Sequence, residues 1–186
     1  MDSNLLAEEQ RIAIGGIRFS VELVHYRHRQ LFPDDRSLAD LLHLVAGRRI
    51  NLPFFCSGRT DGLATSSFCV AAADALEVDG VLAAMDGGRG AGDAPPLAGR
   101  LAKTGRVGTL TLFPHRHSPG LLGRVIASLA GAGIAIHSLC TSISALSLNI
   151  DFDLLERAAA TLQPVVSLPE HHAPFRPEFA IRQIER

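Results

Sequence analysis

A turn-forming segment, residues 117–122 (HSPGLL), separates a β-rich run, Val107 to Phe113, from a helix-like stretch that ends at Gly131-Ala132-Gly133. A second β-rich run begins at Ile134. Glycine at a turn lets the main chain come close to a ligand, and the first turn of a helix has N–H groups without intrahelical partners. Such a helix end attracts carboxylates. The order strand, Pro-Gly turn, helix, strand therefore predicts an α/β unit with an anion site at the start of its helix.

Residues 107–168 carry further features in a fixed order. They are the motif SLCTS at 138–142, alternating apolar residues at 146, 148 and 150, and LLERAA at 154–159. With these features the segment resembles an ACT domain, and most closely the second ACT repeat in the regulatory region of aspartokinases. The resemblance implies a βαββαβ regulatory module that binds amino acids. It does not imply kinase chemistry, because no stretch of the chain resembles the catalytic domain.

The first half of the chain repeats the pattern of the second half. Strand-like and helix-like runs follow one another in the order β-α-β-β-α up to Met85. When Ile50 is set against Ile134, the apolar helix positions of the two halves coincide and Gly47 falls on Gly131. A repeat of this length is typical of two similar modules. The repeat thus predicts two similar modules of the α/β (α+β) class, and the resemblance implies that they are ferredoxin-like βαββαβ ACT modules.

Glycine and proline content places the boundary between the modules. Residues 86–96 combine Gly, Pro and charged side chains, and such a composition cannot form a core. We expect a first module at 11–86, a linker at 87–104 and a second module at 105–170. Residues 164–168 are expected to be the last strand of the second module. In aspartokinase regulatory regions a carboxy-terminal strand returns to the first module, so the resemblance implies that residues 175–186, with the strand-like Phe179 to Ile184, complete the first sheet.

The turn of the second module is the stronger candidate binding site. Ser118 is suited to cap the helix, Pro119 is tolerated at the first helical position, and Gly120 leaves the backbone open to a ligand. A carboxylate would bind there, and the strand expected at 134–137 would meet the ammonium group. The alternative is that Ser-Pro-Gly only starts a helix. The candidate residues are Ser118, Pro119, Gly120, Leu121, Leu122, Ile134, Ala135, Ile136 and His137.

The first module departs from this pattern at the same place. Asp34-Asp35-Arg36-Ser37 replaces Ser-Pro-Gly-Leu, so charged side chains stand where glycine would admit a ligand. Arg36 could bind a carboxylate with its planar fork, and Asp34 or Asp35 could bind an ammonium group. The alternative is that these are solvated turn charges. Asn51 resembles a position that many ACT modules use to touch the effector, which adds it to the candidate ligand-binding residues.

Charge and composition exclude several function classes. The net charge of the 186 residues is −1, the pI is about 6.7 and the arginines are scattered, so a nucleic-acid partner is not expected. Residues 1–10 lack the basic start of a signal peptide, and no apolar run reaches membrane-spanning length. We therefore expect a cytoplasmic protein without a membrane partner.

Histidines and cysteines do not form a recognisable metal or catalytic motif. His115 and His117 are two residues apart and His171-His172 is an adjacent pair, without an HExxH or Cys/His framework. The cysteines Cys56, Cys69 and Cys140 lie in apolar runs, and buried reduced thiols are the interpretation that fits them. No metal and no cofactor are expected.

These observations predict a non-catalytic, allosteric regulatory protein that binds an amino acid or a similar small metabolite through tandem ACT modules. We expect a homodimer. Two alternatives remain open. The chain could be a detached regulatory subunit that docks onto an amino-acid biosynthetic enzyme resembling aspartokinase, or it could be a small Cys- or metal-dependent enzyme.

Overall fold

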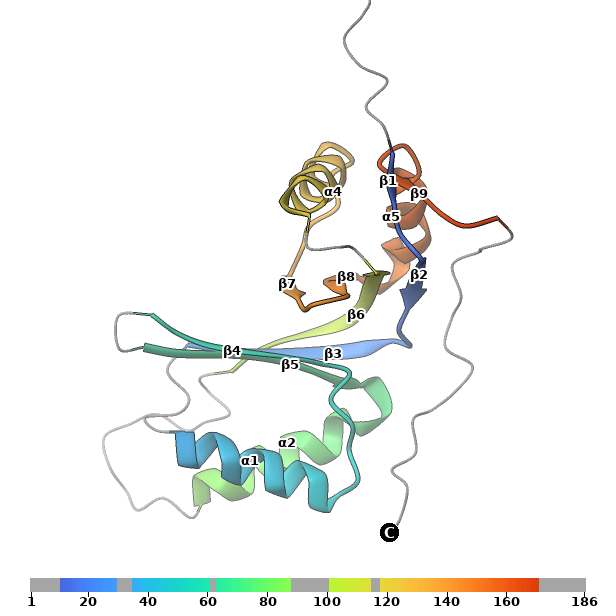
Figure 1. Ribbon diagram of the computed structural model, residues 1–186. Helices are drawn as coiled ribbons and strands as arrows, with labels where there is room; N and C mark the ends of the chain where they lie inside the picture. Colours follow the sequence, from blue (N-terminus) through green and yellow to red (C-terminus); the bar gives the residue numbers. More distant parts are fainter. Residues whose placement is uncertain (1–10, 30–34, 61–62, 88–100, 115–117, 171–186) are drawn as a thin grey trace, which may run out of the picture. The chain divides into compact units, whose positions relative to one another are not determined.

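The computed structural model describes residues 11–29, 35–60, 63–87, 101–114 and 118–170 (Figure 1). The chain divides into two compact units. Of the described residues, those up to Phe19 and those from Thr109 onward form unit 1, and those from Ser20 to Gly108 form unit 2.

Unit 2 is a βαββαβ module. Its elements are β3 (Leu23–Arg29), α1 (Asp35–Gly47), β4 (Phe54–Thr60), β5 (Leu63–Ala71), η1 (Ala72–Asp74), α2 (Ala75–Gly87) and the first part of β6 (Leu101–Phe113). The strand order is β4-β5-β3-β6, and α1 and α2 lie side by side against one face of this sheet (Figure 1). Alternate strand residues are buried against the helices, because successive side chains of a strand point to opposite faces. They are Val24, Tyr26, Phe68 and Val70, which share a core with Leu41, Val45, Val78, Val81 and Leu82.

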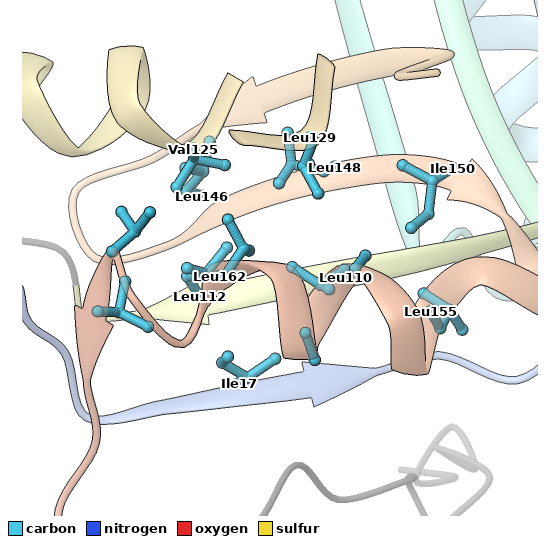
Figure 2. Close-up of a cluster of buried hydrophobic side chains, with 14 of the residues drawn as sticks. Ile17, Leu110, Leu112, Val125, Leu129, Leu146, Leu148, Ile150, Leu155 and Leu162 are labelled. Carbon is cyan, nitrogen blue, oxygen red and sulfur yellow. The ribbon is translucent and has the colours of Figure 1, made fainter. Parts of the chain in front are cut away.

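In unit 1, the elements that follow β6 have the same order as those that follow β3 in unit 2. They are α4 (Pro119–Gly131), β7 (Ser138–Thr141), β8 (Leu146–Asp151), η2 (Phe152–Leu154), α5 (Leu155–Leu162) and β9 (Val166–Ser167), joined by β1 (Ile12–Ala13) and β2 (Gly16–Phe19) from the start of the chain. Strand β6 lies between β2 and β8, and β7 is the outer neighbour of β8. Figure 2 shows the core, in which alternate residues of β6 and β8 meet both helices. It contains Ile17, Leu110, Leu112, Val125, Leu129, Leu146, Leu148, Ile150, Leu155 and Leu162.

The α/β fold class is confirmed, and the internal repeat is confirmed in detail. Arg49 after α1 has a φ of 58° and Gly133 after α4 has a φ of 69°, so the equivalent residues of the two halves are both left-handed. The next residues, Ile50 and Ile134, are both buried and donate their N–H groups to the Val45 and Leu129 carbonyls at 3.2 and 2.9 Å. This is the hydrogen bonding of a helix that ends in a left-handed residue.

The expected position of the first strands was wrong. The run from Ile12 to Phe19 was assigned to the first module, but β2 pairs antiparallel with the second part of β6, and β1 pairs parallel with β9. Ile17 and Phe19 are buried in the core of unit 1. Gly15 permits this path, since a Cβ there would lie 2.5 Å from Pro114 Cδ. The last strand of the second module, expected at residues 164–168, consists of the two residues of β9, and β2 is the strand that pairs with β6.

The expected linker was also wrong at its carboxy-terminal end. Residues 101–104 belong to β6, and this strand pairs with β3 at the position that residues 175–186 were expected to fill. Near the expected start of the second module at residue 105, the register shifts by one residue between the Leu23 and His25 pairs, and Arg106 has a φ of 53°. A bulge of this kind accommodates an extra residue without ending the strand. Phe179 to Ile184 lie outside the described residues.

Candidate functional site

Ser118 caps helix α4 as the sequence predicts. Its Oγ accepts a hydrogen bond from the Leu121 N–H at 3.2 Å, and its carbonyl accepts from the Leu122 N–H at 3.3 Å. Pro119 begins the helix and has no N–H group. Within the described residues the Gly120 N–H has no acceptor, so it remains available at this helix end. The expected set of donors from Gly120 to Leu122 is thus reduced to one N–H together with the helix dipole.

The side chains at this helix end have different roles. Leu121 is 1% exposed and belongs to the core of unit 1, and Leu122 packs against the same core. The Leu121 side chain is therefore taken up by the core, and Leu122 is only partly exposed. Gly120 is exposed, and a Cβ there would meet only Ser118 Oγ, at the ordinary contact distance of 3.5 Å. The fold therefore does not require glycine at position 120, which leaves access to the backbone as a reason for it.

Residues 134–137 do not face this helix end within unit 1. They follow the carboxy-terminal end of α4, and the 13-residue helix separates them from Gly120 by roughly 20 Å. They also do not form a strand, because β7 begins only at Ser138. Ile134 is buried, Ile136 packs against the core and Ala135 is exposed. The structure thus divides the predicted site residues between two ends of the unit.

His137 is held by two hydrogen bonds to strand β8. Its N–H donates to the Asn149 carbonyl at 2.7 Å, and its Nε2 lies 2.8 Å from Asp151 Oδ1. The imidazole is half-buried and the Asp151 side chain is more exposed. The His137 imidazole is therefore directed toward Asp151 at the point where β7 starts.

Asn149 is a residue that the sequence analysis missed. It is fully buried, and its Oδ1 accepts from Thr109 Oγ1 at 2.6 Å while its Nδ2 donates to Ser138 Oγ at 2.7 Å. The amide thus joins β6, β8 and β7 on the sheet face opposite the core residues Leu148 and Ile150. In the sequence Asn149 occupies a polar position of an alternating strand, a pattern that ordinarily indicates a solvent-facing residue, so nothing marked it as buried.

The candidates in unit 2 are also separated. Asp35 and Arg36 lie in the first turn of α1 and not in the preceding turn, and their side chains lie outside the described set. Asn51 is half-buried and follows the carboxy-terminal end of α1, at the opposite end of this 13-residue helix. In both units, the candidate residues thus lie at opposite ends of a 13-residue helix.

Buried titratable groups in unit 2 have structural partners. Tyr26 donates its hydroxyl to Asp79 Oδ1 at 2.9 Å and stacks on Phe68, and Lys103 forms an ion pair with Asp79. Burial, followed by the hydrogen bond to Asp79, raises the pKa of Tyr26 well above its ordinary value. Burial raises the pKa of the Cys69 thiol to about 12, which disfavours the reactive thiolate form.

The described residues offer neither a cluster of metal-ligating side chains nor a membrane-spanning helix. These residues contain no group of three or more His, Cys, Asp or Glu side chains placed to hold a metal ion. His115, His117, His171 and His172 lie outside them. In the part of the chain that the structure describes, no helix combines the length and the apolar character needed to cross a membrane.

The fold is similar to that of aspartokinase regulatory regions. The ligand-free regulatory subunit of aspartate kinase from Thermus thermophilus matches with a TM-score of 0.68 and 14% identity, over 83% of this chain and 99% of that chain. Aspartate kinase from Synechocystis matches with a TM-score of 0.71 and 16% identity, over 83% of this chain and 28% of that one. Aspartokinase III from E. coli in complex with lysine and aspartate matches with a TM-score of 0.59 and 10% identity, over 87% and 35%. No protein-family model and no curated protein matches the sequence.

Proposed function

We propose that the protein is a non-catalytic, cytoplasmic regulatory protein that binds an amino acid or a similar small metabolite. The observation that carries this proposal is the match to a regulatory subunit of aspartate kinase over 99% of that subunit's length. The similarity to the Synechocystis enzyme supports it, since the chain corresponds to 28% of that longer protein. At these identities the similarity concerns the fold, so the place of the ligand is proposed from the residues of the candidate site.

The proposed carboxylate site is the start of α4. The Gly120 N–H and the positive end of a 13-residue helix attract an anion, and the exposed glycine admits it to the backbone. Residues 134–137, at the other end of the helix, provide backbone groups and the imidazole of His137 for the rest of an amino acid.

A complete site of this design requires two copies of unit 1. The two halves are roughly 20 Å apart within one copy, because a helix of 13 residues lies between them. We propose a twofold-symmetric homodimer in which the start of α4 in one copy lies beside residues 134–137 of the other, an arrangement that would produce two equivalent sites. Asp35, Arg36 and Asn51 are the corresponding candidates in unit 2.

Regulation would follow from linkage. An amino acid that binds one arrangement of the protein more tightly than another shifts the population by its differential affinity. The second candidate function is a detached regulatory subunit that docks onto an aspartokinase-like enzyme, and the subunit from Thermus thermophilus favours it. Copurification of an aspartokinase-like enzyme from native extract supports this second candidate, and recovery of the protein as homodimer alone counts against it.

A thermal-shift screen with the proteinogenic amino acids tests the proposal. A ligand at about 100 times its Kd stabilises the folded state by about 2.7 kcal/mol, which is a measurable increase in Tm. The hit is then titrated by calorimetry into Gly120→Val and into the control Gly123→Val. Gly123 lies in the same helix, and a Cβ there meets nothing within 4 Å. We expect Gly120→Val to weaken binding about tenfold or more, because a charge-assisted hydrogen bond is lost, and Gly123→Val to leave it unchanged.

Two results would contradict the proposal. The first is that no amino acid raises Tm, and the second is that both valine variants fold and bind the ligand with wild-type affinity. Light scattering tests the homodimer separately, and a monomer mass at micromolar concentration with and without the hit would refute the two-copy site.

A further inference from the structure

Strand β7 packs against the core through one partly buried side chain, Leu139. It is four residues long, none of its residues is buried, and it is the outer strand beside β8. A short edge strand of this kind is weakly specified in register, because few buried side chains oppose a slip or an opening. In segment 134–138, which leads into β7, Ile134 and Ile136 pack on the core, whereas the polar residues His137 and Ser138 depend on other interactions for their geometry.

Polar contacts with two residues of β8 supply that geometry. Asn149 accepts the His137 N–H with its carbonyl and donates its Nδ2 to Ser138 Oγ, at 2.7 Å in both cases. Asp151 holds the His137 imidazole at 2.8 Å. Through its Oδ1, Asn149 is in turn fixed by Thr109 of β6. Buried amides with satisfied partners specify one arrangement of neighbouring strands, whereas apolar side chains at such positions would permit several.

We propose that Asn149 and Asp151 are positioning residues, which hold segment 134–138 in the single geometry that an amino-acid ligand contacts. This inference rests on the proposed function for its ligand. The anchoring itself is a property of the protein without ligand. Neither residue needs to touch the ligand, since each acts through His137 or Ser138.

The test compares variants that remove an anchor with one that removes a similar bond elsewhere on the same sheet face. Ser138→Ala removes the acceptor of the Asn149 amide, and Asp151→Ala removes the partner of the imidazole. Asp151→Asn retains an acceptor oxygen for His137 and is the conservative rescue. Thr111→Val is the control, because the Thr111 hydroxyl bonds Ser147 at 3.2 Å in the adjacent row and leaves both anchors intact.

Hydrogen exchange of the amides at 134–141 and calorimetry with L-lysine and L-aspartate are the two measurements. Loss of an anchor should speed exchange in this segment by about two- to tenfold and weaken binding by a similar factor, as expected for one hydrogen bond. Asp151→Asn should retain most of the wild-type behaviour, and Thr111→Val should change the stability without changing either measurement.

The outcomes separate this inference from the proposed function. If exchange at 134–141 in Ser138→Ala and Asp151→Ala equals that in Thr111→Val, the positioning role is overturned. If exchange responds and binding does not, the ligand does not use this segment and the positioning role for ligand is likewise overturned. If exchange responds and the wild-type protein binds no amino acid in the screen, the anchoring is supported and the proposed function fails.

Discussion

The two left-handed residues that end α1 and α4 allow one prediction to be worked out in full. Arg49 and Gly133 occupy equivalent positions with φ of 58° and 69°. An L-residue in this conformation costs about 1–2 kcal/mol relative to glycine, while glycine loses about 0.5–1 kcal/mol more backbone entropy on folding. Arg49→Gly should therefore increase the free energy of unfolding by roughly 0.5–1 kcal/mol. Gly133→Ala should decrease it by a similar amount.

The surroundings of Gly133 make this a clean measurement. A Cβ at Gly133 would meet nothing within 4 Å, so the predicted loss is entirely a backbone effect. Gly131 is the matched control. It lies at the end of α4, its φ is not positive, and a Cβ there also meets nothing within 4 Å. Gly131→Ala should thus increase stability, because alanine is favoured over glycine in a helix by roughly 0.5–1 kcal/mol.

Urea denaturation followed by circular dichroism gives the free energies of unfolding for the three variants. The transition of unit 2 is followed independently by the fluorescence of Tyr26, the only tyrosine of a chain without tryptophan. The reasoning would be refuted if Gly131→Ala and Gly133→Ala shifted the midpoint in the same direction, or if Arg49→Gly lowered it.

Three further outcomes are expected. Because burial and Asp79 raise the pKa of Tyr26, the tyrosinate absorbance of the folded protein should not appear near pH 10, where the unfolded chain titrates. The contribution of the protonated Tyr26 hydroxyl to the free energy of unfolding is complete below about pH 10 and is lost as the pH rises above it. Tyr26→Phe should therefore reduce the loss of stability at alkaline pH. Alkylation at pH 8 should leave Cys69 unmodified in the native protein, since its thiol is fully buried with a pKa of about 12, and peptide mass spectrometry should find it modified only after denaturation. Gly15→Ala should lower Tm by forcing Pro114 away from its present position, and a wild-type Tm would show that β1 and β2 relax freely.

The sequence determined the local structure of each half. The apolar spacing that aligns Ile50 with Ile134 predicts the two helices, their ends and the α/β class, because these features depend on periodicity and on Gly and Pro positions along the chain. Ser118 was predicted as a cap for the same reason, since a helix start is specified by adjacent residues.

Tertiary structure decided the partners of the strands and the distribution of the site. A period-two pattern does not specify which neighbour a strand pairs with, so β2 and β6 could be located only from their hydrogen bonds. Gly120 and residues 134–137 lie apart because α4 runs between them, and the order of residues along the chain does not show which parts of a site come together in space. Asn149 shows the same limit for single residues. Alternation assigns it to the outer face of a strand, but only the three-dimensional contacts reveal that this position is buried and that its amide joins Thr109 to Ser138.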